Sequence, residues 1–243
     1  MGPAMKASTM VKKAELGEYT INYASEGSGP SMIMLHGGDK REDWSVWRPL
    51  MSLSKQYSLT IPDLVGFGQS TAAVETPDYI AQARVLHELM DRLAIEKAVL
   101  VGTSWGGQVA LEEAITWPER VESLVLISST YDKAQLPRLR GVNRPALIIW
   151  AEDDHVAQLK AGYVLRDAIR TAKLEVLPPV ANNPRYDFTI SHKLERFRSD
   201  VIVSMIGDFL LAPWQKIAEP PEMEPELRGM AMKEDKEKEG TQK

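Results

Sequence analysis

The feature that most restricts the fold of this chain is the regular alternation of short apolar runs with amphipathic segments. The apolar runs are "SMIMLHG", "SLTIPD", "KAVLVGTS", "VESLVLISS", "PALIIW" and "LEVLP". Helical patterns lie between or after them, in "WRPLMSLSKQY", "PDYIAQARVLHELMDRLAI", "GGQVALEEAITW", "AQLKAGYVLRDAI" and "LERFRSDVIVSMIGDFLL". This order predicts an α/β fold with a doubly wound, mostly parallel sheet of about eight strands and helices on both faces.

The length and the hydrophobic content favour a single domain. A chain of 243 residues with 44% hydrophobic residues is long enough for one sizeable core. We expect a flexible N-terminus over residues 1–14, one α/β domain over residues 15–212, and a disordered tail over residues 213–243, where the sequence is dotted with proline and then densely charged. The stretch "GEYTINYASEGSGP" alternates with a period of two, which predicts a hairpin at a sheet edge.

Charge and cysteine content exclude several classes of function. The net charge of −5 argues against nucleic acid or an anionic membrane as the main partner, because both attract clustered Lys and Arg. The absence of cysteine excludes disulfides, thiolate metal sites and a cysteine nucleophile. Neither a secretory signal nor a run as long as the roughly 18 apolar residues of a membrane span is visible. We therefore expect a cytoplasmic protein whose partners are small molecules or other proteins.

A serine lies between glycines where a predicted strand meets a predicted helix. Gly102, Ser104 and Gly106 form the pattern G-x-S-x-G after "KAVLV" and before "QVALEEA". In this context the pattern is typical of a nucleophile elbow, a sharp turn that exposes a serine hydroxyl and leaves no room for neighbouring side chains. The alternative is a glycine-rich corner whose serine only caps the helix.

A second loop, "LHGGDKREDW", follows the first predicted strand of the parallel sheet. Backbone N–H groups of such a turn can bind the negative oxygen that forms when a hydroxyl attacks a carbonyl. We assign this role to the amides of Gly38 and Trp105. His36, in the same loop, is expected to be a buried structural histidine.

The chain resembles the α/β-hydrolase superfamily in the motifs "LHGG", "IPDLVGFGQS", "VGTSWGG", "WPERVESLVLIS" and "PALIIWAEDD". These motifs occur in the family's order over most of residues 15–211. In relatives whose loop reads W-G-x-x-D, the triad acid lies four residues beyond the tryptophan. The resemblance therefore implies Asp154 as the acid after Trp150, with Asp153 as the fallback. Ala151 stands where the family has glycine.

The catalytic base must come from one of four histidines. His36 lies in the oxyanion loop, His87 lies in a helical stretch, and His155 directly follows the implied acid, which leaves His192. In relatives the histidine follows the last strand at once, but here Asn182 stands at that place and asparagine cannot accept the proton.

An insertion of about ten residues in a surface loop would account for this displacement, because added loop length costs little closure entropy. The distance from His192 to the end of the last predicted helix matches the family. Two possibilities remain open. Either the longer loop returns His192 to Ser104 and completes a triad of Ser104, His192 and Asp154, or the pocket holds a nucleophile without a base.

The segment between "VESLVLISS" and "PALIIW" is short. It comprises residues 130–144, "TYDKAQLPRLRGVNR", which leave no room for the helical cap domain that many relatives insert there. We expect a cap-free, water-open site suited to small or accessible esters. Candidate pocket residues beside the catalytic loops are Trp44, Phe67, Trp105 and Tyr131, and neither a metal nor an organic cofactor is implied.

These observations predict a serine hydrolase, a carboxylesterase, that acts through an acyl-enzyme on a small-molecule ester. Thioesterase, lactonase or perhydrolase activity would use the same residues. A non-catalytic binding or scaffold protein of the same fold is the alternative from another class, and a tail that binds a partner protein is a third.

Overall fold

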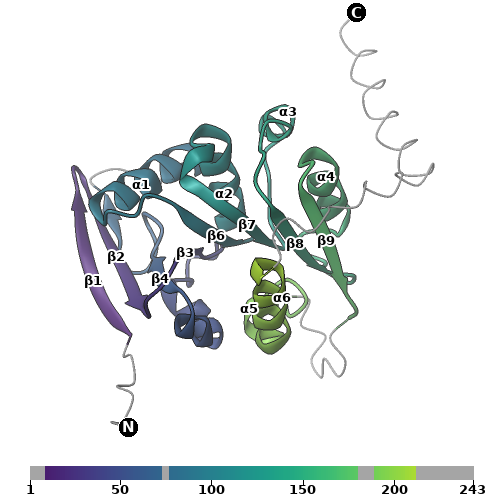
Figure 1. Cartoon of the computed structure of the whole chain (residues 1–243), viewed down its shortest axis with the longest axis horizontal. Coiled ribbons are helices and arrows are strands. Elements are labelled where there is room, and N and C mark those ends of the chain that lie inside the picture. Colours follow the sequence, from purple (N-terminus) through teal and green to yellow (C-terminus); the bar gives the residue numbers. More distant parts are fainter. Residues whose placement is uncertain (1–8, 73–76, 180–188, 212–243) are drawn as a thin grey trace, which may run out of the picture. The chain divides into compact units, whose positions relative to one another are not determined.

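The computed structural model describes residues 9–72, 77–179 and 189–211, which form one mixed sheet with helices on both faces (Figure 1). Its nine strands lie in the order β1-β2-β4-β3-β6-β7-β8-β9, and β5 pairs with β2 off this path. All pairs from β4 to β9 along this order are parallel. The strands are β1 (Met10–Leu16), β2 (Tyr19–Glu26), β3 (Ser31–Leu35), β4 (Ser58–Pro62), β5 (Thr71–Ala72), β6 (Ala98–Thr103), β7 (Val121–Ile127), β8 (Ala146–Ala151) and β9 (Ala172–Leu177). The predicted α/β class and the mostly parallel sheet are confirmed.

The N-terminal hairpin begins earlier than the sequence suggested. Strand β1 starts at Met10 and pairs antiparallel with β2. Our prediction of a flexible N-terminus is therefore wrong for residues 10–14. The reason is that Ala14 and Leu16 are buried, and pairing with β2 extends over the whole strand and satisfies the backbone groups that face β2. Residues 1–8 and the expected tail at 213–243 lie outside the described residues.

The helices divide into two layers (Figure 1). One face of the sheet carries α1 (Tyr79–Arg92), α2 (Trp105–Thr116), α3 (Leu136–Leu139) and α4 (Lys160–Ala168), and the other carries the 3-10 helix η1 (Trp44–Lys55), α5 (Leu194–Phe197) and α6 (Ser199–Leu211). A 3-10 turn, η2 (Pro118–Arg120), leads into β7. Between β7 and β8, residues 128–145 contain α3 and no other helix, so the site has no cap domain of the inserted type.

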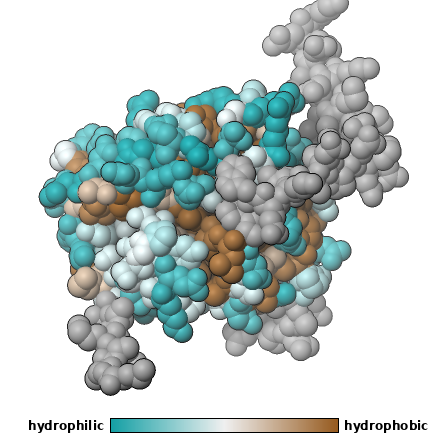
Figure 2. Space-filling view, viewed as in Figure 1, coloured by the Kyte–Doolittle hydropathy of each residue, from teal (hydrophilic) through white to brown (hydrophobic). Residues whose placement is uncertain are grey.

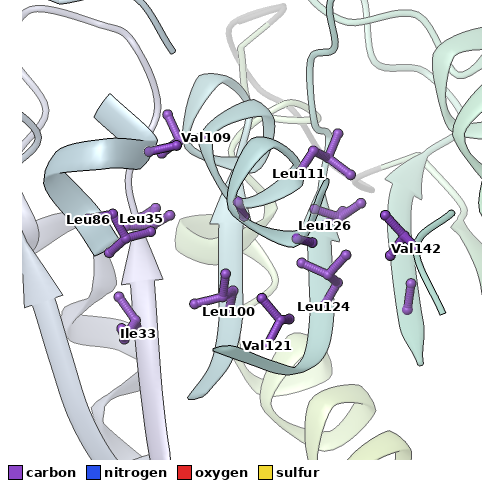
Figure 3. Close-up of a cluster of buried hydrophobic side chains, with 14 of the residues drawn as sticks. Ile33, Leu35, Leu86, Leu100, Val109, Leu111, Val121, Leu124, Leu126 and Val142 are labelled. Carbon is purple, nitrogen blue, oxygen red and sulfur yellow. The ribbon is translucent and has the colours of Figure 1, made fainter. Parts of the chain in front are cut away.

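Alternate residues of the central strands supply the two hydrophobic cores. In β6, Leu100 packs on the α1 and α2 side with Leu86 and Val109 (Figure 3). Its neighbours Val99 and Val101 face the opposite core under η1 and α6. A strand that is apolar on both faces is what burial between two helix layers requires. The strand that leads to Ser104 is therefore fixed from both sides.

Helix α6 covers the sheet with Ile202 and Ile206 but keeps apolar side chains at the surface. Leu211 is 80% exposed, and Phe197 of the preceding α5 is 49% exposed. Figure 2 shows an apolar area on this face where Figure 1 places α6. Within the described residues, no helix has the length and apolar character that a bilayer crossing needs.

The loop after β4 is organised by one buried carboxylate. Asp63 accepts hydrogen bonds from the Asn22 side chain (2.8 Å) and from the backbone N–H groups of Trp44 (2.7 Å) and Gln69 (2.8 Å). It therefore joins β2, the start of η1 and its own loop. This structural role accounts for the aspartate in "IPDLVGFGQS".

Candidate active site

Ser104 lies at the turn between β6 and α2 in a strained conformation. Its φ of 49° and ψ of −118° fall in a region that residues with a side chain rarely adopt. A Cβ at Gly102 would lie 2.6 Å from Gly106 O, and a Cβ at Gly106 would lie 2.3 Å from the backbone oxygens of Leu35 and His36. Both glycines are therefore sterically required for this turn. The Ser104 side chain makes no capping hydrogen bond to α2, which argues against the alternative that it serves only as a helix cap.

His192 and Asp154 form a buried pair. The Nδ1 atom of His192 lies 2.9 Å from Asp154 Oδ2, although the two residues are 38 positions apart in the sequence. Asp154 is fixed in turn, because its Oδ1 accepts the backbone N–H groups of Val156 and Ala157, both at 2.9 Å. A carboxylate at Nδ1 favours the tautomer with the proton on Nδ1, in which Nε2 is the acceptor that a general base requires.

The fallback acid and the other histidines lie in different surroundings. Asp153 has no bond to His192, and its Oδ1 is buried without a partner among the described residues. His87 lies 3.0 Å from Glu113 and stacks on Trp117, in a cluster between α1 and α2. His155 is exposed beside Asp154. Of the four histidines, His192 is the one that pairs with Asp154.

His36 is structural, as the sequence indicated. It is fully buried, its Nδ1 lies 2.7 Å from Gly37 O, and its Nε2 accepts the backbone N–H of Leu64 at 2.9 Å. Burial lowers the pKa of His36, which keeps the ring neutral. The ring thereby fixes the start of the "HGGDKRED" loop against the loop that follows β4.

Ser104 and His192 line one cavity of about 690 Å³. Gly37, Gly38 and Trp105 line it as well, and a Cβ at Gly38 would lie 3.3 Å from Trp105 Cβ. No acceptor within the described ranges takes the backbone N–H of Gly38 or Trp105. The Ser104 hydroxyl likewise makes no hydrogen bond to His192 in the described part of the chain. Direct bonds of this kind often tighten only when substrate is bound.

The predicted pocket aromatics are only partly in place. Phe67 lines the cavity and packs against Trp105, with ring centroids 5.6 Å apart. Trp44 and Tyr131 are not among the lining residues, contrary to our expectation. Trp44 begins η1, where its ring lies under the guanidinium of Arg48 at 4.9 Å, and Tyr131 packs against the hydrophobic core that contains Leu100 and Val109. Both aromatics serve packing near the site.

The cavity also contains five charged side chains that were not predicted from the sequence: Asp39, Arg41, Glu42, Lys193 and Glu195. Their positions in the sequence could have indicated them, because three lie in the predicted oxyanion loop and two follow His192 within three positions.

Glu195 is a buried carboxyl in this cavity. It is 1% exposed, and Thr103 Oγ1 donates to its Oε2 at 3.3 Å. Burial raises the pKa of the Glu195 carboxyl to about 7. No group of three or more His, Asp or Glu residues suited to a metal ion occurs among the described residues.

Comparison with known proteins agrees with this architecture. A family described as "alpha/beta hydrolase fold" matches residues 30–142. The chain is 40% identical over 143 residues to 2-hydroxymuconate semialdehyde hydrolase of Pseudomonas sp. (strain CF600), a match that covers 57% of this chain and 48% of that protein. It is 31% identical over 116 residues to soluble epoxide hydrolase of Corynebacterium sp. (strain C12), which covers 47% of this chain and 40% of that protein. The chain thus spans less than half the length of these curated relatives.

Solved structures share the fold over a larger part of the chain. The 2-hydroxy-6-oxo-6-phenylhexa-2,4-dienoate hydrolase from Rhodococcus sp. strain RHA1 superimposes with a TM-score of 0.74, at 18% identity, over 85% of this chain and 100% of that one. A predicted hydrolase from Thermoplasma acidophilum gives the same TM-score at 15% identity, over 84% of this chain and 99% of that one. At this level of identity the likeness concerns the fold alone.

Proposed function

We propose that this chain, which has the α/β-hydrolase fold, is a serine hydrolase that cleaves small or accessible carboxylic esters. The observation that carries this proposal is the buried pair of His192 and Asp154 at 2.9 Å, in the same cavity as the strained Ser104. The pair of His192 with Asp154 favours a complete triad over the alternative of a pocket that holds a nucleophile without a base. A strained elbow and a paired imidazole are both costly for a protein that only binds.

The mechanism follows from the position of each group. Ser104 Oγ attacks the ester carbonyl while His192 Nε2 takes its proton, and Asp154 holds the resulting imidazolium through Nδ1. The N–H groups of Gly38 and Trp105 donate to the oxygen that becomes negative. His192 then gives the proton to the leaving alcohol, and the acyl-enzyme forms. Water repeats the sequence, with His192 again as the base, and releases the acid.

The epoxide hydrolases among the relatives differ in the expected nucleophile. Epoxide and haloalkane hydrolysis in this superfamily use an aspartate at the elbow, where this chain has Ser104. Ester cleavage accords with a cavity that has no inserted cap domain and contains both apolar and charged side chains. Thioesters, lactones and peracids would require the same groups.

Hydrolysis of a dienoate or semialdehyde is the second candidate. The relative with 40% identity over 143 residues is named for such a substrate, a 2-hydroxymuconate semialdehyde. The two candidates differ in the bond that is cleaved, and both use a serine nucleophile in our proposal.

The test compares purified wild-type protein, Ser104→Ala and Ser52→Ala on p-nitrophenyl acetate and on 2-hydroxymuconate semialdehyde. Ser52 is an exposed serine in η1 and serves as the matched control. We expect ester turnover in the wild type and in Ser52→Ala, and a loss of at least about 10³-fold in Ser104→Ala. Faster turnover of the semialdehyde would favour the second candidate. A folded wild-type protein without turnover of either compound would favour a binding protein.

A further inference from the structure

Two charged side chains join the loop that carries the predicted oxyanion donor to the segment that carries His192. Lys193 Nζ lies 3.0 Å from Glu42 Oε1 and 3.6 Å from Asp39 Oδ2. The side chains of Lys193 and Glu42 are only 17% and 7% exposed. An ion pair at this depth is screened far less than a surface pair.

The pair lies at the nucleophile. A Cβ built on Gly37 would be 2.6 Å from Glu42 Oε2 and 3.4 Å from Ser104 Cβ. The Glu42 carboxylate and the Ser104 Cβ therefore both lie next to the same point beside Gly37, so the side chain that pairs with Glu42 is held close to Ser104.

Within the described residues, the backbone contacts that hold the segment around His192 are local. Its backbone is turned by hydrogen bonds from the N–H groups of His192 and Lys193 to Thr189 O, at 3.1 and 3.0 Å. Leu194 is buried and anchors the start of α5. These contacts fix the turn locally, whereas the pair of Lys193 with Glu42 relates the turn to the loop beside Ser104.

We propose that Lys193 and Glu42 are positioning residues, whose ion pair clamps the histidine segment to the oxyanion loop and so sets the position of the His192 ring opposite Ser104. The inference rests on the proposed function, since it concerns the same reaction. A clamp of this kind acts through His192 and does not require contact of Lys193 with substrate. A misplacement of a catalytic group by about 1 Å costs about 100-fold in rate, so the loss of the clamp is measurable.

The experiment measures kcat and KM on p-nitrophenyl acetate, together with the rate at which a fluorophosphonate labels Ser104. Lys193→Gln and Glu42→Gln each break the pair from one side, and Lys193→Arg keeps it. We expect kcat and the labelling rate to fall about 10- to 100-fold in both Gln variants, with KM changed less than about threefold, and to recover in Lys193→Arg. Exchange of the charges in Lys193→Glu with Glu42→Lys is expected to restore part of the loss.

The control is Lys97→Gln, which breaks the exposed pair of Lys97 with Glu122 and is expected to leave kcat unchanged. The thermal midpoint of each variant identifies those that remain folded, and Glu42→Gln tests the clamp if Lys193→Gln does not fold.

Several results would overturn the proposal. If Glu42→Gln keeps or raises kcat, or if the double variant Lys193→Gln with Glu42→Gln regains full activity, the pair only balances charge and does not position His192. A wild-type protein that neither turns over ester nor is labelled contradicts the proposed function and the clamp together. An active wild type with fully active Gln variants contradicts the clamp alone.

Discussion

The elbow and the histidine segment bring their side chains to one cavity by opposite means. At the elbow, consecutive residues force the geometry, because the backbone around Ser104 closes on Gly102 and Gly106 at distances that no Cβ tolerates. The segment from Thr189 to Phe197 contains no glycine that such a close approach would require. The His192 ring is placed by side chains far away in the sequence, Asp154 for the ring and Glu42 for the next residue. The steric constraint at the elbow is visible in the sequence as a motif, whereas pairs between residues distant in the sequence are not.

The largest effect is expected from a methyl group at the elbow. In Gly106→Ala the new Cβ would meet the backbone oxygens of Leu35 and His36 at 2.3 Å, and backbone atoms of a central strand cannot give way. We expect the variant to lose folded, soluble protein, or to lose turnover completely. Circular dichroism and ester turnover measure the two outcomes. A folded, active Gly106→Ala would disprove the steric account of the motif.

The next effect concerns the long-range pair itself. Asp154→Asn keeps the size of the side chain but removes the carboxylate that orients and stabilises the His192 imidazolium, so kcat should fall by about 10³- to 10⁴-fold. The control is Asp153→Asn, which changes the neighbouring acid and should leave kcat within about threefold. A larger loss in Asp153→Asn than in Asp154→Asn would reassign the acid.

Glu195 gives the histidine segment a pH dependence that the elbow lacks. Burial raises its pKa from 4.5 to about 7, so the folded protein binds more protons than the unfolded chain between these values. The stabilisation is complete below about 4.5 and is lost as the pH rises toward 7. Glu195→Gln should therefore gain stability over the wild type across this interval, by up to about 3 kcal/mol at pH 8.

Urea unfolding at several pH values between 4 and 8 measures this difference. The difference between the two proteins should grow from pH 4.5 to 7 and stay constant above. A difference that does not vary with pH would show that the pKa of Glu195 is the same in the folded and the unfolded chain, and so is not raised by burial.

The smallest effect is expected at Gly207, a glycine that, unlike those of the elbow, has no steric reason to lack a side chain. Gly207 lies within α6, and a Cβ there would have nothing within 4 Å. Gly207→Ala should therefore stabilise the protein by about 0.5–1 kcal/mol, because alanine favours the helix, without a change in kcat. Thermal unfolding checks this value. A destabilised Gly207→Ala would mean that the surroundings of α6 are tighter than the described residues indicate.

Much of the fold was predictable because it depends on periodic burial. The alternation of apolar runs with helical patterns predicted the parallel sheet. The serine turn was predictable because its close backbone contacts require glycine on both sides of Ser104. The resemblance to the family implied Asp154 as the acid, and the oxyanion loop suggested Gly38 as a donor; both roles stay predictions. The start of β1 was missed, since only Ala14 and Leu16 of that strand are buried and the other side chains are exposed.

The charged half of the cavity could not be derived from the sequence. Glu42, Lys193 and Glu195 are of residue types that usually lie at the surface, and their burial depends on contacts between loops that are distant in the sequence. Trp44 and Tyr131 show the opposite error, because they were predicted to line the cavity and do not. Proximity to a catalytic loop in the sequence does not fix the direction in which a side chain points, and both rings turn to packing contacts.

The most direct test of the account is the rate at which a fluorophosphonate modifies Ser104 in three proteins: the wild type, His192→Ala and His155→Ala. Peptide mass spectrometry assigns the adduct. We predict an adduct on Ser104 that forms equally fast in the wild type and in His155→Ala, and at least about 10³-fold more slowly in His192→Ala. If labelling survives in His192→Ala and is lost in His155→Ala, the distant histidine is not the base and the central claim is wrong.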